Sequence, residues 1–319
     1  MSQFLSKCDA SVMGDAARVL INGGLVAFPT ETVYGLGADA CSEMAVARIY
    51  SVKGRPADHP LIVHVASMDL LGEWAGDVPA YAIALARDYW PGPMTLVVTR
   101  SELAGNFITG GQDTVGVRVP NHPVALGLLK AFSRAGGKGV AAPSANRFGN
   151  VSPTTAQAVS DELSDYLAES DVILDGGACA VGVESTIIDC TGDVPKILRP
   201  GAITEEMIEH STGLEVLDAD GVAIRVSGSL ESHYSPIAKV VLDQSPLAGQ
   251  GFIAMADVAT GAGVIRLAAP TTHDEFARVL YSSLRSADKQ GLATVVVSQP
   301  QGDGLAIAIR DRLKRAAHK

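Results

Sequence analysis

Short β-rich runs alternate with helical patterns along residues 11–199 of this chain. The runs are rich in Val, Leu, Ile and Thr and are closed by Gly, Pro or Asn, as strands usually are. The helical patterns between them repeat apolar residues every three or four positions. This alternation predicts a mixed α/β sheet with helices packed on it. Strands are expected at 25–28, 61–65, 95–98 and 115–119, and helices at 11–22, 45–52, 80–89 and 123–132.

A second, smaller α/β domain is predicted towards the C-terminus. After a helical pattern at 204–210, residues 227–236 have neither helical nor strand periodicity, which is typical of a linker. We therefore predict a first domain at residues 1–205, a linker at 206–237 and a second domain at 238–319. In the second domain, strands are expected at 240–242, 252–254 and 294–297, and helices at 274–285 and 304–315.

The net charge of −10 limits the kind of ligand that the chain can hold. A protein held on DNA by bulk charge needs a basic surface, and this composition argues against one. A small basic pocket for one phosphorylated ligand is still compatible with it. The four cysteines have no C-x-x-C spacing and no metal-like spacing with the histidines, so we interpret them as scattered reduced thiols.

No membrane segment is expected from the sequence. No apolar run approaches the roughly 18 residues that are needed to cross a bilayer. Asp9 and Asp15 interrupt the N-terminal region before a signal peptide of ordinary length can form. We therefore expect a cytoplasmic protein that makes no contact with a membrane.

The segment Pro29–Gly37 follows a predicted strand and combines hydroxyl groups, a carboxylate and glycines. The carboxyl end of a strand in an open α/β sheet is a common place for a small-ligand site. Residues 35–40 also fit a loose G-x-G-x-x-A dinucleotide pattern, but no clean strand abuts the first glycine. An ordinary strand-to-helix turn is therefore the better interpretation of that pattern.

The segment Lys53–Pro60 places two cations within three residues at the end of a predicted helix. Lysine is a compact point charge, whereas arginine presents a planar fork that binds two phosphate oxygens at once. Lys53 and Arg55 therefore suit a polyphosphate. An isolated basic turn of this kind is more often a solvated cap at a helix C-terminus.

Two further segments offer hydroxyl and amide groups. Ser144 and Asn146 follow a short predicted strand, and residues 152–155 look like a helix N-terminus, which favours anions. Consecutive caps and turns would explain the same residues. Ser185 begins one predicted strand and Arg199 ends another, so we expect both to face one cleft. The residue types alone predict a phosphate-binding α/β protein.

Seven motifs occur in a fixed order: PTETVYGLG, KGRPADHPLIVHV, WPGPMTLVV, DTVGVRVP, AAPSANRFG, GVESTIID and LRPG. Together they resemble the YrdC-like family of threonylcarbamoyl-AMP synthases. HYSP followed by a further α/β domain resembles the long, two-domain form of that family. The resemblance implies a twisted, open sheet with a basic concave face, a linker across the mouth of the active site and a Rossmann-like second domain.

The resemblance also implies a reaction. L-threonine, bicarbonate and ATP, the last accompanied by Mg²⁺, would give L-threonylcarbamoyl-AMP, pyrophosphate and water. The product would serve the formation of N6-threonylcarbamoyladenosine at position 37 of tRNA, with a transferase complex of other proteins completing that second step.

Site residues follow from the same resemblance. We expect L-threonine to be held by Thr32, His64, Arg118, Ala142 and Ser185. We expect ATP to be held by Arg55, His59, Thr114, Ser144, Asn146, Ser152, Arg199 and Tyr234. His59 stands where the family often has Asn. Lys53 and Arg55 are expected to neutralise charge during the reaction, and we assign neither a general base nor a metal ligand among the side chains.

Two other kinds of protein remain as alternatives. The first is a module that binds double-stranded RNA or tRNA, against which the acidic composition argues. The basic residues at the C-terminus would then make a weak tRNA contact, although a solvated last helical turn explains them better; they are Arg310, Arg312, Lys314 and Arg315. The second is a carbamoyl-transfer domain of hydrogenase maturation, which the lack of C-x-x-C disfavours.

Overall fold

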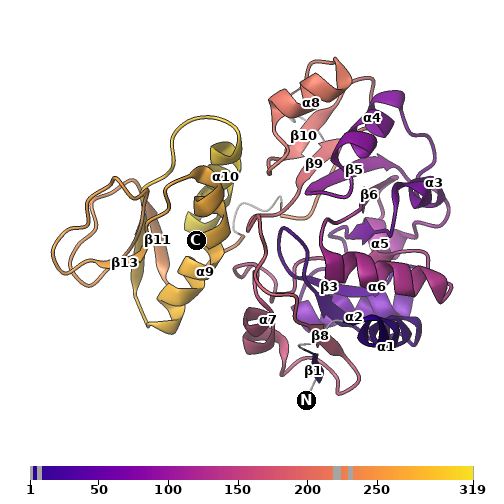
Figure 1. The fold of residues 1–319 in the computed structure, drawn as a ribbon, viewed down its shortest axis with the longest axis horizontal. Coiled ribbons are helices and arrows are strands. Elements are labelled where there is room, and N and C mark those ends of the chain that lie inside the picture. The colour runs from indigo at the N-terminus through magenta and orange to yellow at the C-terminus, as the bar shows by residue number, and fades with distance from the viewer. Residues whose placement is uncertain (1–2, 6–8, 218–223, 229–232, 319) are drawn as a thin grey trace.

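The protein folds into two sheets that belong to two domains of unequal size (Figure 1). The structure is a computed structural model that describes residues 3–5, 9–217, 224–228 and 233–318. The larger domain is drawn from indigo to salmon, and the smaller one is drawn in orange and yellow. The predicted fold class, a mixed α/β sheet with a smaller second α/β domain, is confirmed.

The larger domain is built on a ten-stranded sheet with the order β1-β8-β2-β3-β7-β4-β6-β5-β9-β10. The sheet is mixed, since β4 pairs with β6 in parallel and β5 pairs with β6 antiparallel. Its strands are β1 (Gln3–Leu5), β2 (Val26–Phe28), β3 (Gly35–Asp39), β4 (Ile62–His64), β5 (Met94–Thr99), β6 (Thr114–Arg118), β7 (Val140–Ala141), β8 (Val172–Leu174), β9 (Thr186–Asp189) and β10 (Lys196–Arg199).

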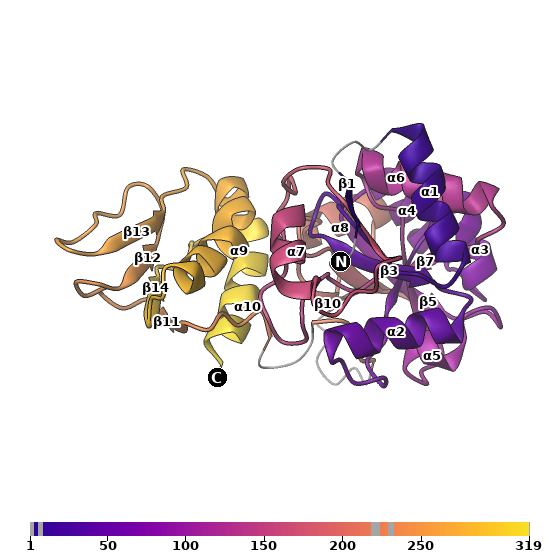
Figure 2. The ribbon, with the colours of Figure 1, turned by 90° about the horizontal axis from the view of Figure 1, so that it is seen from below.

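Helices cover both faces of this sheet, with α1 and α6 on one side and α2 and α5 on the other (Figure 2). Their ends follow ordinary sequence signals: Asp9 caps the start of α1, and Gly54 ends α2 in a left-handed conformation. In the described part of the chain, no helix is long and apolar enough to span a membrane. The α-helices are α1 (Ala10–Ile21), α2 (Glu43–Lys53), α3 (Leu71–Trp74), α4 (Ala80–Tyr89), α5 (Asn106–Thr109), α6 (Pro123–Arg134), α7 (Ala156–Leu163) and α8 (Glu205–Thr212).

The smaller domain has a parallel sheet with the order β11-β14-β12-β13. Its two helices lie between this sheet and the larger domain (Figures 1 and 2). The helices and sheet share a core that includes Phe276, Leu280 and Ile309. The elements are β11 (Lys239–Leu242), β12 (Gly251–Ile253), β13 (Ile265–Ala268), α9 (His273–Lys289), β14 (Thr294–Val297) and α10 (Leu305–Ala317).

The glycine-rich residues 35–39 form strand β3, which the sequence did not predict. The strand pairs with β2 and β7, so the G-x-G-x-x-A pattern is neither a dinucleotide loop nor the expected strand-to-helix turn. A Cβ at Gly37 would collide with Val140 and Phe28. Glycine therefore allows close packing within the sheet here.

The predicted linker at 206–237 begins within a packed helix. Residues 206–212 are part of α8, which lies against α4, and the hydroxyl of Tyr89 donates a hydrogen bond to the carbonyl of Met207 over 2.7 Å. Farther along, residues 224–228 and 233–237 are described, whereas 218–223 and 229–232 of the predicted linker lie outside the described residues.

An ion pair with the buried Asp171 fixes α2 to the start of β8. This fully buried carboxylate accepts hydrogen bonds from Arg48 and from two backbone N–H groups. Asp171→Ala removes hydrogen bonds to a buried charged group, so we expect the free energy of unfolding to fall by about 1.5–3 kcal/mol. Urea denaturation measures the change. Asp15→Ala breaks an exposed pair with Arg18 and should have much less effect, and equal losses in both variants would contradict this account.

Candidate active site

A cavity of about 50 Å³ lies at the carboxyl ends of β4 and β6. The two strands are parallel and in register, which sets their last residues, His64 and Arg118, side by side. Segment 142–144, the residues before β9 and parts of the linker complete the walls. Many of the predicted site residues line this cavity, namely Thr32, Arg55, His64, Arg118, Ala142, Ser144, Ser185, Arg199 and Tyr234.

Arg118 is buried and already carries a carboxylate partner. Its Nη2 donates to Oε1 of Glu31 over 2.7 Å and to the hydroxyl of Thr32 over 3.0 Å. The backbone N–H of Asn121 donates to the other oxygen of Glu31. Because these contacts fix the guanidinium at the cavity wall, Arg118 is well placed to bind a second anion with its remaining N–H groups.

His64 is a neutral side chain in this cavity. Burial, together with the nearby guanidinium of Arg118, lowers the pKa of His64 to about 3. Its Nδ1 is buried and has no hydrogen-bond partner among the described residues. Buried polar atoms are almost always paired, so this nitrogen is a candidate for a contact with a ligand.

Arg55 and Arg199 also line the cavity, and both contact Ser227 of the linker. Arg199 donates to the carbonyl of Ser227 over 2.7 Å and to the hydroxyl of Ser185 over 3.1 Å, and Arg55 donates to the hydroxyl of Ser227 over 3.2 Å. Burial lowers the pKa of Arg55 to about 10, which leaves the guanidinium charged at neutral pH. Two positive charges therefore face one small space.

Tyr234 lines the cavity and also packs between the domains. Its ring stacks on Tyr281 of α9 with the ring centres 5.7 Å apart, and the guanidinium of Arg312 lies 5.4 Å from its ring centre. Its hydroxyl is buried without a partner among the described residues. A Cβ at Gly228 would collide with this hydroxyl, so the linker needs a glycine there.

Lys53 is fully buried but does not line the cavity. Its Nζ donates to the backbone carbonyl of Ser144 over 2.6 Å and to that of Asn146. The amide of Asn146 in turn donates to the carbonyls of Arg147 and Asn150. Both side chains therefore bind backbone carbonyls of the 144–150 loop and stabilise its conformation. The sequence had led us to expect contacts of these side chains with phosphate.

Ser152, His59 and Thr114 also lie outside the cavity wall. The buried hydroxyl of Ser152 donates to Glu184 over 2.6 Å. The half-exposed ring of His59 packs edge-on against Phe148 at 5.4 Å. Thr114 lines a smaller neighbouring cavity together with Val226 of the linker.

Sequence reasoning missed the two carboxylates that organise the site, Glu31 and Glu184. Both are buried, and both bind an arginine: Glu31 pairs with Arg118, and Glu184 pairs with Arg312 over 2.8 Å. The available signal was a carboxylate set among hydroxyl groups in the motifs PTET and GVEST. Arg312 was expected on a solvated surface, but it is fully buried, which corrects that expectation.

The fold and this cavity define a class of protein. Buried arginines line one cavity, and guanidinium groups suit carboxylate and phosphate ligands; hydroxyl groups and a neutral imidazole in the same lining offer further hydrogen bonds. The chain is therefore a two-domain α/β protein with an interior site for small anionic molecules.

Comparisons with known proteins extend over both domains. A family model described as telomere recombination matches residues 18–201, and another described as threonylcarbamoyl-AMP synthase, C-terminal domain, matches residues 203–318. Threonylcarbamoyl-AMP synthase of Pyrococcus abyssi is 40% identical, with 95% of this chain and 93% of that protein covered. The enzyme of the same name from Bacillus subtilis is 36% identical, with 96% and 92% covered.

A solved structure is similar over the whole chain as well. The crystal structure of P. abyssi Sua5 complexed with L-threonine has a TM-score of 0.88 and 36% sequence identity, and the match covers 99% of this chain and 97% of that one. The chain belongs to the threonylcarbamoyl-AMP synthase family, in its two-domain form.

The buried His64 predicts a pH-dependent stability. Its pKa in the folded chain lies far below the ordinary 6.5, so the unfolded chain binds the proton first as the pH falls. The stability that depends on neutral His64 is complete above pH 6.5 and is lost progressively below it. Between pH 7 and pH 5 we expect this residue to cost ~2 kcal/mol of unfolding free energy. Urea denaturation at both pH values measures it, and His64→Gln should reduce the dependence by about that amount. An unchanged dependence in that variant would contradict the assignment.

Proposed function

We propose that this protein makes L-threonylcarbamoyl-AMP and pyrophosphate from L-threonine, bicarbonate and ATP. One observation carries the proposal: three buried arginines, Arg55, Arg118 and Arg199, line one cavity. The relatives that this chain matches over nearly their whole length are named threonylcarbamoyl-AMP synthase. The substrates bring a carboxylate, a bicarbonate and a triphosphate, all of which are anions that arginine binds well.

Arg118 is the residue proposed to hold the carboxylate of L-threonine. Glu31 and Thr32 fix one edge of its guanidinium, and Ser185 and His64 line the same cavity. The P. abyssi protein was solved as a complex with L-threonine, which supports an amino-acid subsite of this kind.

Arg55 and Arg199 are proposed to hold the phosphates of ATP. The amine of threonine and bicarbonate form a carbamate and release water. An oxygen of the carbamate then attacks the α-phosphorus, and the bond to the bridging oxygen breaks as pyrophosphate leaves. The two guanidinium groups neutralise the charge that develops, and the closed cavity keeps water from the unstable carbamate. Lys53 contributes by holding the 144–150 loop.

Entry of ATP requires a change in the linker. Typical ligand cavities have volumes of roughly 300–1,000 Å³, whereas this one has about 50 Å³. Ser227, Gly228 and Tyr234 line the cavity and lie outside both sheets. We propose that these residues move outwards when ATP enters and close over it afterwards.

Mg²⁺ is expected to arrive with ATP. The described residues include no cluster of three or more His, Cys, Asp or Glu that would hold a metal ion. The two carboxylates beside the cavity, Glu31 and Glu184, are both paired with arginine. The site therefore fits an ion carried by the triphosphate, whose charge it would neutralise, and we assign no ligand from the chain.

The later fate of the product is part of the proposal. The adenylate would pass to a transferase complex that modifies tRNA at position 37, in the cytoplasm.

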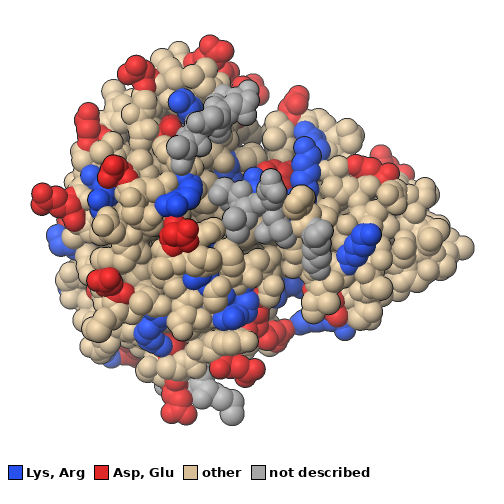
Figure 3. Space-filling view, turned by 180° about the vertical axis from the view of Figure 1, so that it is seen from behind, with Lys and Arg blue, Asp and Glu red and all other residues tan. Residues whose placement is uncertain are grey.

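In Figure 3, basic and acidic side chains are interspersed on the face shown, with no broad basic field for an RNA backbone. The net charge of −10 disfavours the RNA-binding alternative as the main role. The match of residues 203–318 to the synthase C-terminal domain disfavours the carbamoyl-transfer alternative.

The activity itself is tested by leaving out one substrate at a time. We expect pyrophosphate release only when L-threonine, bicarbonate, ATP and Mg²⁺ are all present, because the carbamate must form before the α-phosphorus is attacked. A coupled pyrophosphate assay measures the rate. Equal release without threonine would reject the proposal and indicate a nucleotide hydrolase.

Two arginine variants separate the two halves of the site. Arg118→Ala should chiefly raise the KM for threonine, because it removes the partner of the carboxylate. Arg55→Ala should chiefly impair the use of ATP, with kcat/KM for ATP falling by roughly 10²-fold or more. Steady-state kinetics with each substrate varied in turn measures both effects. The reverse pattern would show that the two arginines have been assigned to the wrong ligands.

A further inference from the structure

Two largely buried carboxylates of the larger domain accept hydrogen bonds from side chains of the smaller domain. They are Glu184, which precedes β9, and Glu162 in α7. Their partners come from α9 and α10, the two helices that lie against the larger domain. Each carboxylate also accepts a hydrogen bond from the 146–152 segment: Glu184 from Ser152, and Glu162 from Arg147 and Asn150. Each therefore connects the smaller domain to a segment beside the active site.

Glu184 makes the more deeply buried of the two connections. Its Oε2 accepts hydrogen bonds from the hydroxyl of Tyr281 over 2.9 Å and from Nε of Arg312 over 2.8 Å. Its Oε1 accepts the hydroxyl of Ser152 over 2.6 Å. The next residue along the chain, Ser185, lines the cavity and binds Arg199.

The charge of Glu184 makes this connection depend on its partners. Burial raises the pKa of Glu184, but Arg312 and Arg199 lower it more, to about 2, and the carboxylate is charged at neutral pH. A buried charge is stable only with its partners in place. The orientation of Glu184, and with it that of Ser152, therefore depends on two side chains from the smaller domain.

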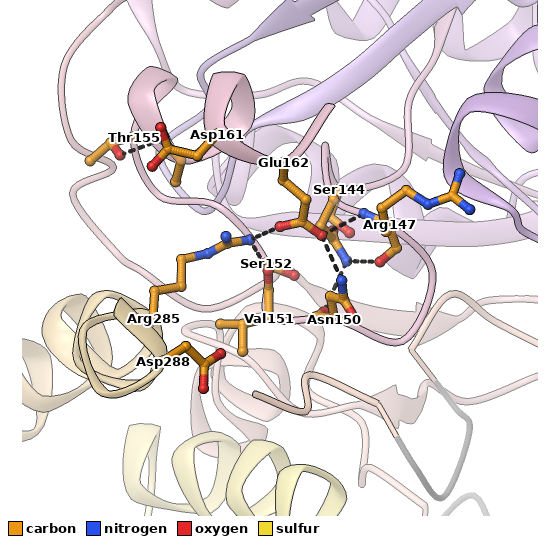
Figure 4. Close-up of polar contacts among 12 residues, drawn as sticks. Ser144, Arg147, Asn150, Val151, Ser152, Thr155, Asp161, Glu162, Arg285 and Asp288 are labelled. Carbon is orange, nitrogen blue, oxygen red and sulfur yellow. Dashed lines mark hydrogen bonds and ion pairs between the residues drawn. The ribbon is translucent and has the colours of Figure 1, made fainter. Parts of the chain in front are cut away.

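Glu162 makes the second connection at the domain interface (Figure 4). One oxygen accepts hydrogen bonds from the backbone N–H of Arg147 over 2.7 Å and from the amide of Asn150 over 2.9 Å. The other oxygen accepts Arg285 of α9 over 2.6 Å. Arg285 also donates to the carbonyl of Val151. The loop that carries Ser144 and Asn146 is thus fixed from the side of the smaller domain.

We propose that the smaller domain positions the ATP half of the active site. Arg285 acts through Glu162 on the 144–151 loop, and Tyr281 and Arg312 act through Glu184 on Ser152. All three are positioning residues, since they do not line the cavity wall. The proposal rests on the proposed function for the identity of the ligand. It explains why the catalytic domain carries a second domain at this particular edge.

Two single-residue variants test the proposal. Tyr281→Phe removes one hydrogen bond to Glu184 and keeps the ring that stacks on Tyr234, and Arg285→Ala removes the partner of Glu162. A hydrogen bond to a charged group contributes about tenfold or more to an equilibrium constant. We therefore expect the KM for ATP to rise about tenfold in each variant, while the KM for threonine changes less than about twofold.

A matched control comes from the same helix. Lys289 lies one turn beyond Arg285 and pairs with Asp161 across the same interface, but this pair is largely exposed and contacts no site loop. Lys289→Ala should leave both KM values unchanged. Arg285→Lys should recover most of the lost ATP affinity, because it restores the charge next to Glu162. Thermal denaturation shows that each variant is folded.

Calorimetric titration of ATP into each protein gives a readout that does not need turnover. Loss of ATP affinity in Tyr281→Phe and Arg285→Ala, but not in Lys289→Ala, would support the proposal. Unchanged affinity in the folded variants, or an equal rise in both KM values, would overturn it. Failure of the wild-type protein to release pyrophosphate would instead overturn the proposed function, and the titration would still decide whether these residues position an ATP site.

Discussion

The pairing of buried charges determines how this molecule is built. Buried charged side chains lie within or beside one cavity, among them Glu31, Arg55, Arg118, Glu184, Arg199 and Arg312. Each would cost several kcal/mol if it were buried alone. The chain compensates by setting Glu31 against Arg118 and Glu184 against Arg312, and by giving Arg199 three oxygen partners. The Glu184–Arg312 pair crosses between the domains, and Arg199 connects the site to the linker.

The fold supplies the positions that such pairing needs. Parallel, in-register β4 and β6 end in His64 and Arg118, and the glycines of β3 let the sheet pack closely beside them. Lys53, at the end of α2, directs its charge at two backbone carbonyls of the neighbouring loop. A cation that binds backbone oxygens keeps that loop in place without adding to the charge that faces the ligand.

Local patterns predicted much of the fold and part of the site. The strand at 115–119 and the helix at 123–132 were visible because apolar periodicity and a proline at the helix start act over a few residues. Strand β3 was missed because its glycines carry no strand signal. The partner of Glu184 was not predictable, since Arg312 lies 128 residues away and its surroundings in the sequence look like a charged helix surface. Long-range pairing of this kind leaves no trace in local periodicity.

The central claim is that the cavity joins threonine, bicarbonate and the adenylyl group of ATP into one molecule. Mass spectrometry of the products formed from ¹³C-bicarbonate, L-threonine and ATP tests it most directly. The account predicts an adenylate that contains threonine and is heavier by the mass of the label, together with pyrophosphate. A reaction that yields only unlabelled AMP or ADP would contradict it.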